Sequence, residues 1–313
     1  MKSVSDVIHK WLLGGDPAIR FQVYRDLLGD RERAVEEQSK IANFGWGKAF
    51  LEKRNSHGHW GHSFYQPKWI SSHYTLLDLK NLGIKPDVPI PREVVERILK
   101  EEKGLDGGVN PGSTTHKSDV CVSGMLLNYA SYFGARENEL ESIVDFLLKE
   151  WMPDGGFNCQ SNRKGAMHSS LHSTISVMEG ITEYELNGYQ YRLATLKEAL
   201  ANSLEFIMIH HLFRSDHTGQ VIDKKMLRFS YPCRWKYDVL RALDFFQYAK
   251  ITFDKRMEEA VSLLLNKRRK EGTWPLQARH PGKIHFEMEK PGKPSRWNTL
   301  RALRVLKWYH EWK

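Results

Sequence analysis

A turn of the form Gly-x-large apolar recurs along the chain, and it constrains the fold more than any other feature. A helical aliphatic segment precedes each turn, and a helix that starts with Ser or Pro follows it. The turn glycines lie about 50 to 60 residues apart, at Gly58, Gly107, Gly155, Gly219 and Gly272. This period, with helical patterning on both sides, indicates repeated helix pairs that must stack or close to bury their apolar faces.

Apolar residues at helical spacing mark two alternating sets of helices. The first set is amphipathic and charged, which is typical of outer helices, and covers about 3–13, 32–53, 91–103, 137–150, 191–213 and 252–270. The second set is richer in small residues and in Thr, Ser, His and Tyr, and covers about 17–28, 72–83, 118–133, 168–185, 233–250 and 296–312. Cap residues such as Ser71, Ser118 and Ser295 support these starts.

Six pairs predict an all-α fold, an (α/α)6 toroid of six helical hairpins with a central cavity, as one domain over residues 1–313. An open solenoid of helix pairs is the alternative. The segment 278–294 has three prolines and no helical period, so we expect an insertion that caps the cavity as a lid.

The composition predicts a soluble cytoplasmic protein. No segment approaches the roughly 18 uncharged residues of a membrane span, so we expect no stable membrane insertion. Asp6, His9 and Lys10 interrupt the apolar residues at the start, which does not fit a secretory signal. Three cysteines are an odd and sparse set, which favours reduced thiols over a disulfide framework.

The net charge of +9 could attract nucleic acid, an anionic membrane or a diphosphate. The basic residues are spread along helices, however, and the densest run, 267–270, ends an amphipathic helix where cations favour the dipole. No zinc-finger, RRM or helix-turn-helix signature accompanies it. We therefore expect no nucleic-acid partner.

The turns that follow leucine-rich helices, in 146–157 and 263–274, resemble the repeats of squalene cyclases and protein prenyltransferase β subunits. The strings at 16–20, 232–240 and 295–303 resemble uncharacterised bacterial squalene-cyclase-like proteins. The resemblance covers essentially the whole chain. It implies the closed toroid of the terpene cyclase and prenyltransferase superfamily, but a shared toroid does not transfer chemistry.

The resemblance implies an acidic motif that this chain lacks. Squalene cyclases protonate their substrate with Asp-x-Asp-Asp, and class I terpene synthases bind metal through Asp-Asp-x-x-Asp, whereas this sequence contains no Asp-Asp pair. Sterol- or hopanoid-type cyclisation is thus disfavoured. A single catalytic acid, Asp119 or Asp238, is the remaining cyclase hypothesis.

The prenyltransferase branch implies a zinc site. Its β subunits hold zinc through Asp-x-Cys at the start of one inner helix and a His at the start of the next, which correspond here to Asp119, Cys121 and His172. Three such ligands leave a fourth position for substrate. Residues i and i+2 converge only where a helix has barely begun, and a thiol in a first turn is shifted toward thiolate. The alternative makes Asp119 a first-turn acid, Cys121 a core residue and His172 a polar lining residue.

A second candidate cluster overlaps the first. His168 and His172 are four residues apart, which on a helix puts two imidazoles on one face, as a metal or an acid–base pair needs. Cys159 lies in the preceding loop and could complete the site. Paired histidines at a helix start also serve as cap partners, and that alternative stays open.

Aromatic and cationic residues at the expected inner-helix starts predict a substrate cavity. They are His73, Tyr74, Arg234, Trp235, Tyr237, Arg296 and Trp297. Aromatic faces suit isoprenoid chains and carbocations, and Arg suits phosphate or carboxylate. Ordinary helix packing with Arg–Asp pairs is the alternative.

The leading hypothesis is an enzyme that acts on an isoprenoid or another apolar small molecule in an aromatic cavity, with a catalytic zinc. The rival is a non-catalytic toroid that binds a lipid or a protein. Whether a protein partner is needed, as in the prenyltransferases, is not specified by the sequence.

Overall fold

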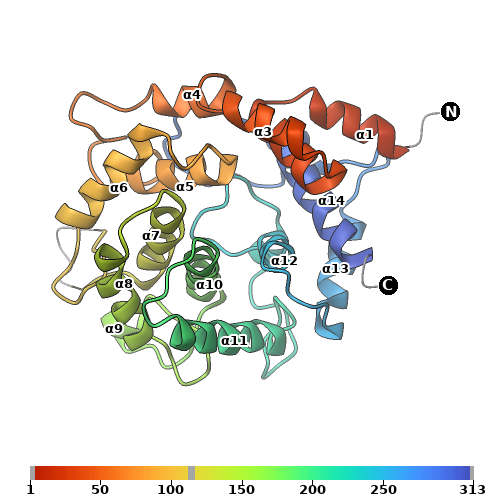
Figure 1. The fold of residues 1–313 in the computed structure, drawn as a ribbon. Helices are drawn as coiled ribbons and strands as arrows, with labels where there is room; N and C mark the ends of the chain where they lie inside the picture. Colours follow the sequence, from red (N-terminus) through yellow and green to blue (C-terminus); the bar gives the residue numbers. More distant parts are fainter. Residues whose placement is uncertain (1–3, 112–116, 311–313) are drawn as a thin grey trace.

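The computed structural model describes residues 4–111 and 117–310, and within them the helices form two concentric rings (Figure 1). The inner ring consists of α2 (Pro17–Gln22) with its π-helical continuation (Val23–Leu28), α5 (Ser72–Leu82), α7 (Val120–Tyr132), α10 (Leu171–Leu186), α12 (Val239–Tyr248) and α14 (Arg296–His310). The all-α fold and the six-pair toroid predicted from the repeat are confirmed.

The outer ring packs against the inner one with its apolar stripes. It consists of α1 (Val4–Leu13), α3 (Arg31–Lys40) with α4 (Gly45–Leu51), α6 (Pro89–Glu101), α8 (Glu137–Lys149), α11 (Leu193–Ile209) and α13 (Glu258–Asn266). Short elements lie in the connections between these helices, namely η2 (Lys68–Ile70), α9 (Ser161–Lys164), η3 (Lys224–Leu227) and η4 (Lys255–Met257). Two strands, β1 (Trp274–Pro275) and β2 (Pro294–Ser295), pair antiparallel before α14.

Some helix bounds differ from the predicted ones. The expected outer helix 32–53 is split into α3 and α4, since the chain turns before Gly45, whose φ is +63°. The expected inner helix 233–250 begins only at Val239, because the Asp238 side chain caps it by accepting a hydrogen bond from the Arg241 N–H at 2.9 Å. The residues before Asp238 therefore lie in a loop instead of a first helical turn.

The recurring turns have a common structure. All five turn glycines have φ between +67° and +96°, a region that favours glycine. In four of the five turns, the N–H of the large apolar residue donates to a Ser or Thr hydroxyl at the start of the next inner helix. These bonds join Trp60 to Ser72, Val109 to Ser123, Phe157 to Thr174 and Trp274 to Thr299. Each of these four turns thereby attaches an outer helix to the start of an inner one.

Charged side chains hold the inner ring closed. Arg304 of α14 donates to Asp244 of α12 and also to Asp26, beside α2, at 3.0 Å. Arg241 of α12 forms a bidentate pair with Glu179 of α10, at 2.8 and 2.6 Å. The last inner helix is thus tied to the first, which hides both ends of the repeat.

The predicted insertion forms the connection between β1 and β2. Its backbone accepts a hydrogen bond from Trp69 Nε1 at Pro281, and His285 pairs with Thr75 of α5 at 2.9 Å. Phe286 packs on Phe50, with ring centroids 4.6 Å apart. The segment therefore lies across the N-terminal end of α5, and whether it acts as a lid stays a prediction.

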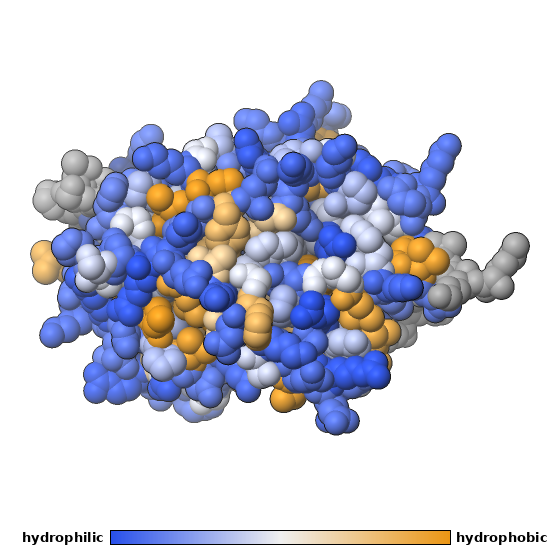
Figure 2. Space-filling view, turned by 90° about the horizontal axis from the view of Figure 1, so that it is seen from above, coloured by the Kyte–Doolittle hydropathy of each residue, from blue (hydrophilic) through white to orange (hydrophobic). Residues whose placement is uncertain are grey.

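The face of the molecule seen from above is mostly hydrophilic (Figure 2). Figure 2 shows one face on which hydrophilic residues predominate and hydrophobic residues form small, separate patches. Among the described residues, no helix has the length and apolar character needed to cross a bilayer.

Candidate functional site

Asp119, Cys121 and Cys159 come together at the N-terminal end of α7. One possible ligand atom from each, a carboxylate oxygen and two sulfurs, lies within 4.8 Å of the other two. Both thiols approach the same oxygen, Asp119 Oδ1, at 3.1 Å from Cys121 and 3.0 Å from Cys159. Three groups that can each carry a negative charge thus face one point.

The start of α7 explains this convergence. Asp119 is the N-cap of the helix, with extended backbone angles (φ −100°, ψ 121°), and its Oδ1 accepts from the Cys121 N–H at 3.1 Å. Because the helix begins only at Val120, residues 119 and 121 are not on opposite sides. Their convergence requires that the helix should have barely begun at these residues, and the structure meets that requirement.

Cys159 reaches the cluster from the loop after the Gly155 turn. Its sulfur accepts hydrogen bonds from the Cys121 N–H at 3.2 Å and from the Ser173 hydroxyl at 3.1 Å. The Ser173 hydroxyl also accepts from the Cys159 N–H at 3.0 Å. These bonds orient the sulfur toward Asp119, as hydrogen bonds to metal ligands do.

Two cations lie beside the cluster. Arg163 Nη1 is 3.1 Å from Asp119 Oδ2, the oxygen that the thiols do not use. Lys68 lies 5.0 Å from the ring centroids of both Trp69 and Trp235. Burial lowers the pKa of Lys68, and the nearby Cys121 and Asp119 oppose that shift.

The surroundings of Cys121 disfavour its ionisation. Its hydrogen bond with Cys159, its burial and the Asp119 carboxylate all raise its pKa well above the usual value. The sequence predicted the opposite, a thiol shifted toward thiolate by the helix dipole. That prediction is wrong, because the neighbouring acid and the lost hydration outweigh the dipole.

The predicted histidines do not join the cluster. His172 Nδ1 accepts a hydrogen bond from the Tyr237 N–H at 2.7 Å, and its ring packs against Trp235. Burial lowers the pKa of His172 to about 4. His168 is exposed and lies before α10, which begins at Leu171, so the two imidazoles do not share a helix face. The cluster instead contains Cys159, which the sequence named as a possible further ligand.

The other predicted aromatic residues are largely core residues. His73 and Tyr74 are fully buried, and the pKa of His73 is lowered to about 3 by burial. Tyr237 is buried and donates to the Leu212 carbonyl at 2.6 Å. Trp235 is half-buried beside Lys68 and remains near the cluster.

The predicted cationic residues and second acid are engaged elsewhere. Arg234 pairs with buried Asp78 at 2.9 Å. Arg296 lies over the indole of Trp11 in the outer helix α1. Asp238 caps α12 and accepts from the Ser230 hydroxyl at 2.9 Å, and burial raises its pKa.

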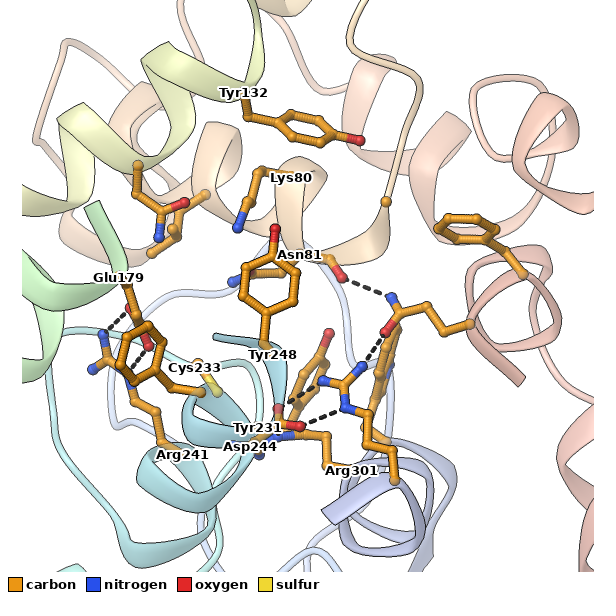
Figure 3. Close-up of a pocket in the computed structure, with 18 of the residues that line it drawn as sticks. Lys80, Asn81, Tyr132, Glu179, Tyr231, Cys233, Arg241, Asp244, Tyr248 and Arg301 are labelled. Carbon is orange, nitrogen blue, oxygen red and sulfur yellow. Dashed lines mark hydrogen bonds and ion pairs between the residues drawn. The ribbon is translucent and has the colours of Figure 1, made fainter. Parts of the chain in front are cut away.

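A central cavity of about 230 Å³ lies inside the inner ring. It extends from Tyr132 and Tyr248, at the C-terminal ends of α7 and α12, to Tyr231 and Trp297 at the other end. Figure 3 shows Lys80 between the rings of Tyr132 and Tyr248. Of the seven cavity residues predicted from the sequence, Trp297 alone lines it.

The cavity wall is charged as well as aromatic. Five cationic side chains line it, Arg25, Lys80, Arg241, Arg301 and Arg304, together with two carboxylates, Glu179 and Asp244. The aromatic wall that the isoprenoid hypothesis predicted is therefore only part of the surface. Neither Asp119 nor Asp238 is among the lining residues.

The sequence contains a signal for two cavity residues that the prediction missed, Arg301 and Arg304. Arg301 and Arg304 follow Trp297 by four and seven residues, so all three lie on one face of α14. Taken alone, such a stripe indicates a solvent-facing side. Only the closure of the ring turns it inward.

Comparisons with known proteins support the fold. No protein-family profile and no curated protein sequence matches the chain. A glycosyl hydrolase family 88 structure from Bacteroides vulgatus is similar over 99% of both chains, with a TM-score of 0.52 and 12% identity. The type II terpene cyclase MstE from Scytonema matches 87% of this chain and 96% of its own, with a TM-score of 0.35 and 15% identity. These likenesses concern the helical toroid alone, and the first of them supports it.

Proposed function

We propose that this protein is an enzyme whose Asp119, Cys121 and Cys159 hold one catalytic zinc ion. The observation that carries the proposal is the convergence of their three ligand atoms within 4.8 Å. Two thiolates and one carboxylate suit zinc, and three protein ligands leave a position open for a reacting group. A bound zinc ion lowers the pKa of a water, alcohol or thiol in that position.

The charges around the cluster support the proposal. Zinc with two thiolates and a carboxylate would carry one net negative charge. The Arg163 guanidinium, 3.1 Å from Asp119, offsets that charge. Thiols that stay reduced, as the odd and sparse cysteine set favours, fit the cytoplasmic location that we propose.

The neighbouring residues favour a substrate with an apolar portion. The faces of Trp69 and Trp235 lie around the Lys68 ammonium, next to the cluster. An isoprenoid or another apolar small molecule could pack on them, with an anionic group toward Lys68. We keep this substrate class as the proposal and place it at the cluster instead of the central cavity.

Metal analysis of the purified protein tests this function. We expect one zinc per chain, and we expect Cys121→Ser and Cys159→Ser to lose it. Cys233→Ser is the matched control, since Cys233 is outside the cluster and should keep full zinc. His172→Ala should also keep it. A folded wild-type protein that takes up no zinc from a zinc-containing buffer would contradict the proposal.

A further inference from the structure

The central cavity contains a guanidinium group with unused hydrogen-bonding capacity. Arg301 is 2% exposed and lines the cavity. Its Nε donates to Asp244 at 3.0 Å, and its Nη1 lies 3.3 Å from both the Ser230 carbonyl and Asn298 Oδ1. Among the described residues, its Nη2 has no hydrogen-bond partner. A buried charged donor without a partner is costly, and such groups call for an additional acceptor.

The other cationic groups of the cavity are already paired within the protein. Arg241 is bound by Glu179, and Lys80 lies 2.9 Å from Glu183. Arg304 is shared by Asp244 and Asp26, and Arg25 also pairs with Asp26. Arg301 is thus the cationic lining residue with a spare donor, because Asp244 serves both it and Arg304.

The side chains that line the cavity carry more positive than negative charge, since five cationic residues face two carboxylates. Three carboxylates behind the wall, Asp26, Glu183 and buried Asp238, offset this difference. The guanidinium charge of Arg301, whose Nη2 has no partner among the described residues, is therefore what calls for an anion. Burial in a low-dielectric interior strengthens the attraction of such a charge for an anion.

The rest of the cavity wall indicates which kind of ligand body would fit. Tyr231 stacks on Trp297 with ring centroids 4.5 Å apart, and both line the cavity. Asn128, which is 3% exposed, lines it as well, and its Oδ1 has no partner among the described residues. The volume of about 230 Å³ is below the roughly 300–1,000 Å³ of sites for drug-sized ligands.

We propose that the central cavity is a second binding site, which takes a small organic monocarboxylate on Arg301. The carboxylate accepts from Arg301 Nη2, while the Tyr231 and Trp297 rings pack on the body of the ligand. A singly charged carboxylate fits better than a phosphate, because Arg301 Nη2 is the one buried guanidinium nitrogen of the lining that lacks a partner among the described residues. The site is separate from the zinc cluster and does not depend on it.

Calorimetric titration of the wild-type protein tests this site. The ligands are acetate, lactate, benzoate and gluconate, and each is compared with its uncharged amide. We expect at least one acid to bind, and its amide to bind at least tenfold more weakly. Inorganic phosphate should bind more weakly than that acid. Absence of binding by all four acids, or equal binding of acid and amide, would overturn the proposal.

Two variants assign the binding to Arg301. Arg301→Lys keeps the charge beside Asp244 but removes Nη2, and should weaken the acid at least tenfold. Should that variant not fold, Asn128→Asp places a negative charge on the cavity wall and should weaken it similarly. Arg234→Lys is the matched control, because Arg234 is buried but does not line the cavity. If Arg301→Lys folds and binds the acid with unchanged affinity, the ligand lies elsewhere and the assignment is overturned. The assignment is also overturned if Arg234→Lys weakens binding as much as Arg301→Lys does.

Discussion

At the scale of the residue, the most informative side chain is Cys121. It follows the N-cap Asp119 by two residues, and its thiol donates to the cap carboxylate instead of lying free in the first turn. Its raised pKa means that a metal ion must displace a proton to bind there. The Asp119 carboxylate can therefore cap the helix and bind a metal. Its Oδ1 faces the thiols, and its Oδ2 faces Arg163.

Zinc binding should release protons and strengthen as the pH rises. Below the raised pKa of Cys121 the free thiol is protonated, so the apparent affinity should increase about tenfold per pH unit for each proton released. Titration with zinc in buffers of different ionisation enthalpy measures the release. Cys233→Ser should show the same pH slope as the wild type. A pH-independent affinity between pH 6 and about 8 would contradict the thiol assignment.

At the scale of the element, the most extensive helix contact within the described residues is that between α7 and α10. It depends on Gly124 and Gly180, which face each other across the interface. A Cβ on Gly124 would lie 2.9 Å from the Ser176 carbonyl oxygen, and one on Gly180 would collide with the Gly124 carbonyl. The two helices that begin at the cluster are thus packed backbone to backbone, which holds Asp119 and Ser173 in place.

Gly180→Ala should destabilise the protein. Alanine in a helix interior is normally favourable by about 0.5–1 kcal/mol relative to glycine, but here the added methyl group forces the helices apart at a cost of about 1–3 kcal/mol. Urea unfolding followed by circular dichroism measures the difference in the free energy of unfolding. An increase in that free energy would show that the interface is looser than described.

At the scale of the whole molecule, largely buried ion pairs tie the last inner helix of the toroid to the first. Arg304 contacts both Asp244 and Asp26, and its side chain is 15% exposed. The same residues that close the ring also line its cavity. Ring closure and the charge of the cavity are thus one structural feature.

Arg304→Ala should cost about 3 kcal/mol in the free energy of unfolding, because it removes the largely buried cation that Asp244 and Asp26 share and leaves each carboxylate with one arginine in place of two. Arg256→Ala is the matched control, since Arg256 also contacts two acids, Glu205 and Asp254, but at the surface with 32% of its side chain exposed. Its cost should be about 0–1 kcal/mol. Equal costs in denaturant unfolding would show that the ring does not depend on the internal pair.

The sequence predicts the ring well and the sites only in part. The recurring turns, with glycines of positive φ, are local features and could be recognised directly. The composition of the cluster could not be predicted in full, because it depends on the path of the loop that brings Cys159 to Cys121, 38 residues away in sequence. The charged face of α14, with Arg301 and Arg304, could not be placed inside, because a polar helical stripe looks the same whether it faces solvent or an enclosed cavity.

The most direct test of the zinc assignment is X-ray absorption at the zinc edge of the metal-loaded protein. The proposal predicts two sulfur neighbours at about 2.3 Å and oxygen neighbours at about 2.0–2.2 Å, from Asp119 and one non-protein ligand. Cys159→Ser should reduce the sulfur shell to one atom. A wild-type spectrum with fewer than two sulfur neighbours, or with imidazole scattering that His172→Ala removes, would contradict the account.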